Sequence, residues 1–192
     1  MGNSHLDAQA RRVVSGVGAD GRSCVVSDEY TRTRLATPGN TKCDIWRFAS
    51  LPTTFDATSG LSENVITDPP EGGFVYRVVT FPPDSEWDRS QGYSDANGQL
   101  AGTVPAEEAG GIPGMHFTRT VDILTVLSGE LWAVLESEEV CLRPGDTFVQ
   151  RGTVHAWSNR GNEPATIVAL MVSAEPPRNP TSDVKQDEPP NK

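Results

Sequence analysis

Two histidines and an aspartate in the C-terminal half of the chain are the residues best suited to chemistry. In the stretch HFTRTVDILTVLSGE, His116, Thr118, Thr120 and Asp122 occupy alternate positions ahead of a run of aliphatic residues. Alternate residues of a β-strand share one face, so this stretch predicts a polar patch followed by core. A second cluster, PGDTFVQRGTVHAWSN, places His155 after a glycine bend. Imidazole titrates near neutral pH and also binds metals, so the predicted chemistry is proton transfer or metal ligation.

Three further residues near these clusters are candidates for contacts with a substrate. Thr118 follows the first histidine at the same parity, Gln150 precedes the bend before the second histidine, and Trp157 follows that histidine at the same parity. A few polar groups at one end of otherwise apolar strands are what a pocket in a barrel mouth requires. We therefore predict Thr118, Gln150 and Trp157 as substrate-binding residues, and the two histidines with Asp122 as catalytic residues.

Short β-strands are the elements that must position these side chains. The segments LSGE, LRPGD and NRGNEP have the composition of turns, and they divide the C-terminal part into β-rich runs. Such closely spaced short strands are typical of an antiparallel sandwich or barrel. We expect strands at about 116–127, 130–136, 139–143, 147–150, 154–159 and 165–173.

The organisation of the whole chain follows from the same signals. RRVVSGVGADGRSCVVSDE, TKCDIWRFA and FVYRVVTF indicate strands within residues 1–83, which we expect to pack on a barrel core formed by residues 116–174. Residues 84–115 are polar and rich in glycine, and this predicts a long loop or lid. The charged, proline-rich residues 175–192 predict a disordered tail. The chain is long enough for one domain with a sizeable core.

Composition excludes several classes of protein. The net charge of −10 argues against binding to nucleic acid or to an anionic membrane. The three cysteines are far apart and form no CxxC motif, so a disulfide scaffold is not expected. The N-terminal MGNSHLDAQARR lacks the apolar run of a signal peptide, and no segment is long enough to span a membrane. We therefore expect a cytoplasmic protein.

At the two histidine clusters the chain resembles a small single-domain cupin. The first motif of that family is glycine, five residues, His-x-His, three or four residues, glutamate, six residues and glycine. Gly110, His116, Thr118, Asp122 and Gly129 stand at those spacings here. The resemblance implies an all-β cupin barrel, a double-stranded β-helix similar to a jelly roll, with extra N-terminal strands.

The second motif of the family supports the same resemblance. Gly145, Gly152, His155 and Asn159 match it, while Gln150 stands where proline is usual and the spacer after Gly145 is one residue shorter. The GDTFVQRGTVHAWSNR segment is similar to a subgroup of small bacterial and fungal cupins, several of which are encoded with secondary-metabolite pathways. The resemblance covers about residues 110–173, and it implies a homodimer.

The resemblance also implies a divalent metal, but two of the ligand positions differ here. Thr118 replaces a usual histidine ligand, and Asp122 is one methylene shorter than the usual glutamate. His116, Asp122 and His155 would still form a set of two histidines and one carboxylate, suited to Fe, Zn or Mn. Alternatively, the pocket holds no metal and the histidines act as acid–base groups. Both alternatives stay open, and no nucleotide cofactor is expected.

Taken together, these features predict an enzyme of the lyase or isomerase type. Its substrate would be a small oxygenated acid or polyketide-like metabolite, changed by proton transfer in a decarboxylation, dehydration or isomerisation. An Fe(II)-dependent oxygenase is one alternative, and a cupin that binds a small ligand without chemistry is another. No nucleic acid or membrane partner is expected.

Overall fold

The computed structural model describes residues 4–89 and 110–176, and within these ranges the chain is built mainly from β-strands and the segments that connect them. The all-β fold class predicted from the sequence is confirmed. Two short 3-10 turns, η1 (His5–Asp7) and η2 (Asp84–Glu86), accompany the strands. In these ranges the strands are β1 (Arg11–Val17), β2 (Ser23–Tyr30), β3 (Arg34–Ala36), β4 (Thr41–Phe48), β5 (Phe74–Phe81), β6 (Thr120–Ser128), β7 (Leu131–Leu135), β8 (Glu139–Leu142), β9 (Thr147–Arg151), β10 (His155–Ser158) and β11 (Ala165–Ser173).

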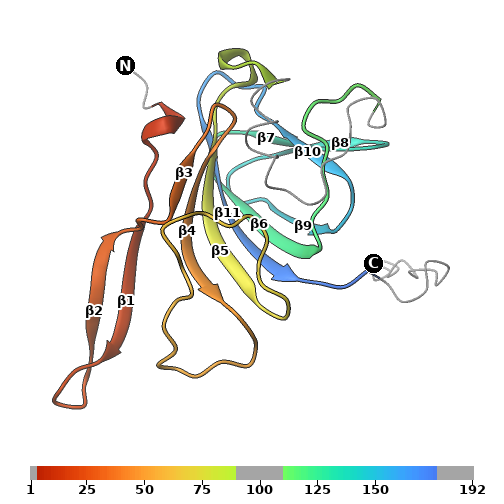
Figure 1. Cartoon of the computed structure of the whole chain (residues 1–192). Helices are drawn as coiled ribbons and strands as arrows, with labels where there is room; N and C mark the ends of the chain where they lie inside the picture. The colour runs from red at the N-terminus through yellow and green to blue at the C-terminus, as the bar shows by residue number, and fades with distance from the viewer. Residues whose placement is uncertain (1–3, 90–109, 177–192) are drawn as a thin grey trace, which may run out of the picture.

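The described strands form three antiparallel sheets (Figure 1). The largest has six strands in the order β3-β4-β5-β11-β6-β9, and the second has three in the order β10-β7-β8. Strands β1 and β2 form a separate hairpin that projects away from the other two sheets (Figure 1). The barrel is therefore made by the six-stranded and three-stranded sheets, while the hairpin lies outside it.

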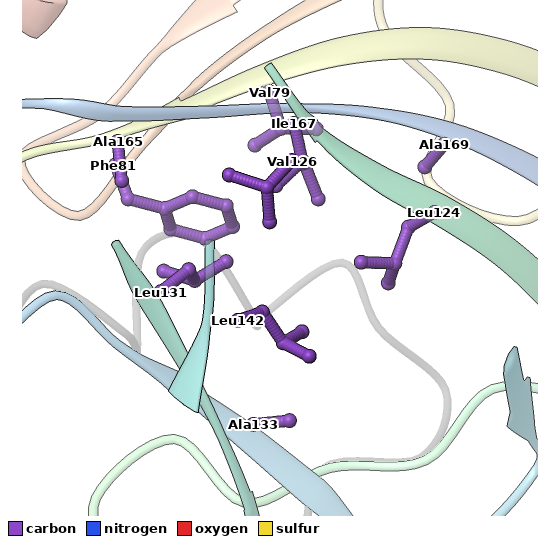
Figure 2. Packing of buried hydrophobic residues seen from close by; sticks show 10 residues of the cluster. All are labelled: Val79, Phe81, Leu124, Val126, Leu131, Ala133, Leu142, Ala165, Ile167 and Ala169. Carbon is purple, nitrogen blue, oxygen red and sulfur yellow. The ribbon is translucent and has the colours of Figure 1, made fainter. Parts of the chain in front are cut away.

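The apolar core of the barrel lies between its two sheets (Figure 2). Strands β5, β6 and β11 line it from the large sheet, and β7 and β8 line it from the small one. Burial of each large aliphatic side chain contributes about 1.5–3 kcal/mol, so this cluster holds the two sheets together. Its members are Val79, Phe81, Leu124, Val126, Leu131, Ala133, Leu142, Ala165, Ile167 and Ala169.

The inward face of β6 changes character along the strand. Thr120, Asp122, Leu124 and Val126 are all buried, as the alternation in the sequence predicts. The first two of these are polar and the last two belong to the apolar core. One face of one strand therefore supplies both a polar region and a packed core.

A glycine makes the sharp turn from β6 to β7. Gly129 has φ of +73°, a conformation that favours glycine, and a Cβ atom built on it would lie 2.8 Å from Cα of Ala165. The chain passes here from the large sheet to the small one. The motif glycine is thus required by backbone conformation and by close packing against β11.

The structure differs from the sequence-based organisation in two places. Strand β6 begins at Thr120 instead of residue 116, so His116 lies outside it. Strands β3, β4 and β5 come from the region before residue 84, yet they are hydrogen-bonded members of the barrel sheet, since β5 pairs with β11. Only the hairpin resembles the expected addition to a barrel core.

Two of the expected segments fall largely outside the described residues. Most of the predicted loop or lid at 84–115 lies there, as does the predicted tail from residue 177 onward. Across residues 4–89 and 110–176 there is no helix long and apolar enough to cross a membrane.

Candidate functional site

The two histidines singled out in the sequence are joined through their main chains. The amide of His116 donates to the carbonyl of His155 at 2.9 Å, and the amide of His155 donates back to the carbonyl of His116 at 2.9 Å. This reciprocal pair forms an isolated antiparallel bridge between β10 and the segment before β6. The ring centroids are 4.4 Å apart. The backbone itself therefore sets the separation of the two imidazoles.

Both imidazole rings are oriented by main-chain carbonyls. Nδ1 of His116 lies 2.8 Å from the carbonyl oxygen of Gly114, and Nδ1 of His155 lies 3.0 Å from that of Thr153. A carbonyl oxygen only accepts, so each Nδ1 carries the proton and donates it. In the neutral rings Nε2 is then the unprotonated nitrogen, available as a base or a ligand.

Burial keeps the histidine pair neutral. It lowers the pKa of His155 to about 3, with the nearby His116 as the second cause, and it lowers the pKa of His116 as well. Because charge on one ring opposes charge on the other, the pair takes up one proton before a second becomes accessible. At neutral pH both imidazoles are therefore unprotonated at Nε2.

The histidines line a small cavity of about 80 Å³ inside the barrel. Apolar residues of the core line part of it, and polar residues from β4, β5, β6 and β10 line the rest. The described residues that line it are Asn40, Lys42, Thr67, Arg77, Val79, Phe81, His116, Thr118, Asp122, Leu124, His155, Trp157, Ile167, Ala169 and Met171. Four of the sequence candidates besides His116 are therefore brought together here: Thr118, Asp122, His155 and Trp157.

Asp122 is a buried carboxyl on the cavity wall. Burial raises its pKa to about 6, against the opposing influence of Thr120 and of the positive charge of Arg77. Its Oδ1 atom has no hydrogen-bond partner among the described residues. Thr118 and Thr120 bond to each other through their hydroxyls at 2.6 Å. Asp122 can therefore hold or release a proton close to neutral pH.

The predicted metal ligands His116, Asp122 and His155 all line the cavity. Within the described residues, no group of three or more His, Cys, Asp or Glu side chains lies close enough together to hold an ion. Thr118 and the shorter Asp122 stand where the resemblance implies histidine and glutamate, so a bound metal stays a prediction. The two Nε2 atoms are the ligating groups that the site presents side by side.

Gln150 supports the site from outside the cavity. Its side-chain amide donates to the carbonyl and the hydroxyl of Thr153, at 2.7 and 2.6 Å. The same carbonyl orients His155. Gln150 is not among the described lining residues, so its position supports a role in holding the bend before His155 instead of the predicted contact with a substrate.

Trp157 forms an aromatic side of the cavity. Its ring lies edge-on to His155 with centroids 5.3 Å apart, and it also contacts Phe148 and Phe81 at centroid distances of 6.0 and 6.5 Å. The indole is thus fixed by aromatic packing. Its predicted role in binding a substrate is compatible with this position.

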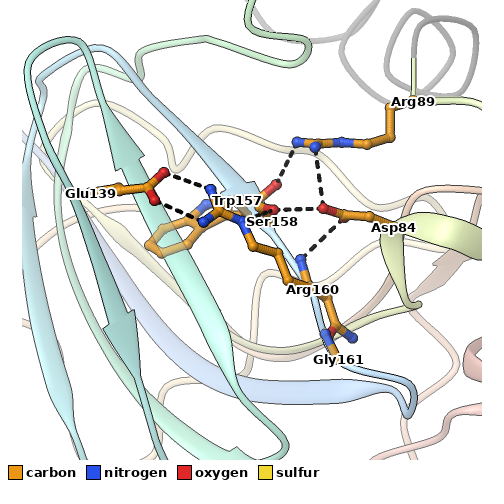
Figure 3. Close-up of polar contacts among 8 residues, drawn as sticks. Asp84, Arg89, Glu139, Trp157, Ser158, Arg160 and Gly161 are labelled. Atoms are coloured by element: carbon orange, nitrogen blue, oxygen red, sulfur yellow. Dashed lines mark hydrogen bonds and ion pairs between the residues drawn. The ribbon is translucent and has the colours of Figure 1, made fainter.

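A polar network anchors the chain on either side of Trp157 (Figure 3). Asp84 accepts hydrogen bonds from the hydroxyl of Ser158 at 2.5 Å and the amide of Asn159 at 3.1 Å, and it pairs with Arg89 at 3.1 Å. Asn159 donates in turn to the carbonyls of Phe81 and Glu163 at 3.1 and 2.8 Å. The motif asparagine therefore fixes the end of β10, and with it the cavity wall.

Two charged residues of the cavity were missed in the sequence. Arg77 on β5 pairs with Asp44 on β4, with Nε and Oδ1 2.9 Å apart and both side chains 2% exposed. Burial raises the pKa of Asp44 and lowers that of Arg77, so at both ends desolvation outweighs the attraction between the partners.

Lys42 is the second missed residue, and it lies on β4 two positions before Asp44. It is 8% exposed and lines the cavity. Burial lowers its pKa to about 8, with the charge of Arg77 as the next cause. The available signal was a lysine and an aspartate at alternate positions of a strand that also carries large apolar residues, but a lysine in a strand more often faces solvent.

A larger open cleft lies beside the cavity and is a weaker candidate. Its volume is about 560 Å³, and Thr118 borders both spaces. The cleft lining includes the carboxylates of Asp68, Glu71 and Glu175 with a single arginine, Arg119, but neither histidine. The chemistry expected of imidazoles therefore belongs to the smaller cavity.

Comparison with known proteins finds a family match in the C-terminal region. Residues 106–172 match the family described as Cupin domain. Phomopsin biosynthesis cluster proteins C′ and D of Diaporthe leptostromiformis are each 42% identical over 69 residues, which cover 35% of this chain and 36% of each relative. The Neurospora crassa cupin-domain-containing oxidoreductase srdB is 38% identical over 64 residues, 32% of this chain and 33% of that protein. The match thus spans about a third of the length of these relatives.

Solved structures that align with this chain share little sequence with it. A putative ethanolamine utilization protein Q of Salmonella typhimurium aligns over 88% of this chain and 99% of its own, with TM-score 0.42 and 10% identity. KdgF from Halomonas sp. aligns over 74% and 87%, with TM-score 0.40 and 15% identity.

Proposed function

We propose that this chain, which carries a cupin domain at residues 106–172, is an enzyme that moves a proton on a small oxygenated acid. The reaction would be a decarboxylation, a dehydration or an isomerisation. The observation that carries the proposal is the pair of buried, neutral imidazoles whose Nε2 atoms are left free by the bonds at Nδ1. A base in a water-poor cavity is what proton abstraction requires.

The residues of the cavity have different roles in this reaction. His116 accepts the proton, because the mutual repulsion in the pair keeps the more strongly shifted His155 neutral. His155 accepts a hydrogen bond from the substrate at Nε2 and orients it. Asp122, with a pKa of about 6, returns a proton to the product. The wall formed by Trp157 and the apolar floor limits the access of water.

The relatives support a metabolite as the substrate. Two of them are named as proteins of a phomopsin biosynthesis cluster. A role in secondary metabolism is therefore part of the proposal, as the resemblance implied.

Deuterium wash-in tests the proposal whichever of the three reactions takes place. The protein is incubated in D2O with small keto and hydroxy acids, and exchange or loss of carbon-bound protons is followed by NMR. His116→Asn and His155→Asn are expected to lower the rate about 10²- to 10⁴-fold, the usual contribution of a general base. Arg143→Gln, at an exposed position, serves as the control and should keep the wild-type rate.

Two results would contradict the proposal. Unchanged rates in both histidine variants would remove the imidazoles from the chemistry. Ligands that bind but are recovered unexchanged after long incubation would instead favour the non-catalytic binding protein.

An Fe(II)-dependent oxygenase is the second candidate. The observation in its favour is the Neurospora crassa relative, which is named an oxidoreductase. His116 and His155 would be the metal-binding residues, although the described residues do not gather a third ligand around them. Metal analysis of protein purified without chelator, with turnover measured under oxygen with added Fe(II), tests this candidate. Bound iron and oxygen-dependent turnover would favour it over proton transfer.

We also propose that two copies associate through the hairpin of β1 and β2. Val13, Val17, Val25 and Val26 are exposed on this two-stranded sheet, which projects from the barrel (Figure 1). Two strands alone are marginally stable in water, and their open edges favour pairing with another chain. Light scattering is expected to give the mass of a dimer, and Val17→Thr with Val25→Thr is expected to shift it toward the monomer.

A further inference from the structure

We propose that Lys42 is the anion-binding residue of the cavity and that it takes the carboxylate of the ligand. The substrate class is then a small carboxylic acid that carries a hydroxyl group. That this ligand is a substrate rests on the proposed function, whereas the binding of a carboxylate to Lys42 does not.

The first observation is that Lys42 has no counter-charge of its own. Among the described residues its ammonium forms neither an ion pair nor a hydrogen bond, although the side chain is only 8% exposed. It lines the same cavity as the two histidines. A buried charge is unfavourable unless it is paired, so an unpaired ammonium beside a cavity indicates that the ligand supplies the anion.

The neighbouring charges leave this role to Lys42. Arg77, on the adjacent strand β5, is engaged by Asp44 and donates to the carbonyl of Ile66 at 2.9 Å. Asp68 and Asp44 act on Lys42 at longer range without forming an ion pair. Of the described cations in the cavity wall, Lys42 is the one still available.

Two further polar atoms of the cavity wall specify the rest of the ligand. Oδ1 of Asn40 and Oγ1 of Thr67 are buried and have no hydrogen-bond partner among the described residues. The hydroxyl of Thr67 can donate to a carboxylate, while the amide oxygen of Asn40 accepts a hydrogen bond from a ligand hydroxyl. A cavity of about 80 Å³ admits only a few heavy atoms, so the bound end of the ligand is small.

The binding of acetate tests the proposal, with acetamide as a neutral probe of the same shape. Dissociation constants are measured by NMR titration at constant ionic strength on the full chain. Wild-type protein is expected to bind acetate more tightly than acetamide. Lys42→Met should weaken the binding of acetate about 10- to 100-fold, which is the contribution of a charge-assisted hydrogen bond, and leave the affinity for acetamide unchanged. Lys42→Arg should retain most of the affinity for acetate.

A stability measurement shows whether Lys42→Met is folded. Methionine has a similar shape and carries no charge, so the variant is expected to unfold at the same temperature as the wild type or a higher one. Arg143→Met, at an exposed position, should leave both affinities unchanged. The proposal is overturned if Lys42→Met binds acetate within twofold of the wild type, or if acetamide binds wild-type protein as tightly as acetate. If wild-type protein binds acetate as expected but shows no deuterium exchange with the small keto and hydroxy acids, only the proposed function is contradicted.

Discussion

The two halves of the barrel interior share strands β5, β6 and β11 but have opposite chemistry. On β6 the inward face passes from Asp122 to Leu124 and Val126, and on β5 it passes from Arg77 to Val79. One half is a packed apolar cluster between the sheets (Figure 2). The other half surrounds a cavity with charged and imidazole groups. Along the inward faces of these strands, the residues that stabilise the fold and the residues suited to chemistry therefore occupy different parts.

Burial also has opposite effects on the free energy of the folded chain in the two halves. Burial of the apolar cluster lowers the free energy of the folded chain. In the polar half, burial raises the pKa of Asp122 and lowers those of Lys42 and His155, so each charged form is disfavoured. The apolar half therefore has to offset the polar half, and mutations in the two halves should have different signatures.

The largest change in stability is expected from the buried ion pair of the polar half. Asp44→Leu leaves Arg77 buried without its partner, and the free energy of unfolding should fall by about 3–5 kcal/mol. The double variant Asp44→Leu with Arg77→Met removes both charges and should recover most of that loss. Urea unfolding monitored by circular dichroism measures both. A double variant no more stable than the single one would contradict the view that desolvation outweighs the attraction in this pair.

A slightly smaller loss is expected from the apolar half. Leu131 is fully buried in the core, and Leu131→Ala should lower the free energy of unfolding by about 2–5 kcal/mol through lost burial and a cavity. Acetate binding and deuterium exchange should stay near wild-type values in the folded variant. A large loss of binding at unchanged stability would mean that the two halves are not separate.

The effect that is smallest over a single pH unit distinguishes the halves by pH. The pKa of His155 is lowered from 6.5 to about 3, so between these values the unfolded chain binds a proton that the folded chain does not. Stability therefore falls as pH falls through this window, by up to about 1.4 kcal/mol per pH unit. His155→Asn should remove this contribution. Asp122, whose raised pKa acts in the opposite direction below about pH 6, is present in both proteins and cancels in the comparison.

The same titration on Leu131→Ala provides the control. Its free energy of unfolding should be lower than that of the wild type by a constant amount across the same pH window, since no titrating group is altered. A His155→Asn profile parallel to the wild type would show that this imidazole does not titrate differently in the folded state.

The C-terminal strands could be predicted well from the sequence because their signals are local. All six expected strands are present, and His116, Thr118, Asp122, His155 and Trp157 line one cavity. Alternation and the turn residues predicted the strands, whereas the meeting of the two histidine clusters was implied by the resemblance to cupins. The position of His116 outside β6 was not predictable, because its bridge to His155 depends on a contact between distant segments.

Lys42 and Arg77 could not be predicted as cavity residues because their placement depends on long-range pairing. Strand β5 joins the barrel through β11, whose residue Ala165 pairs with Phe81. Without that pairing, β4 and β5 resemble additions to a barrel, and their charges resemble surface charges. Gln150 shows the opposite case. Its place in the sequence before the bend predicted a position in the pocket, whereas its side-chain amide donates to the carbonyl of Thr153 in that bend.

The main-chain bridge between residues 116 and 155 has a consequence for engineering. Its hydrogen bonds use only peptide groups, so exchanging either side chain leaves the spacing of the two Cα atoms in place. The barrel thus offers a pair of interchangeable positions held in register by the backbone. Cysteine, glutamate or non-natural side chains introduced there would start from a preset geometry, which makes these two positions suitable for installing new reactivity.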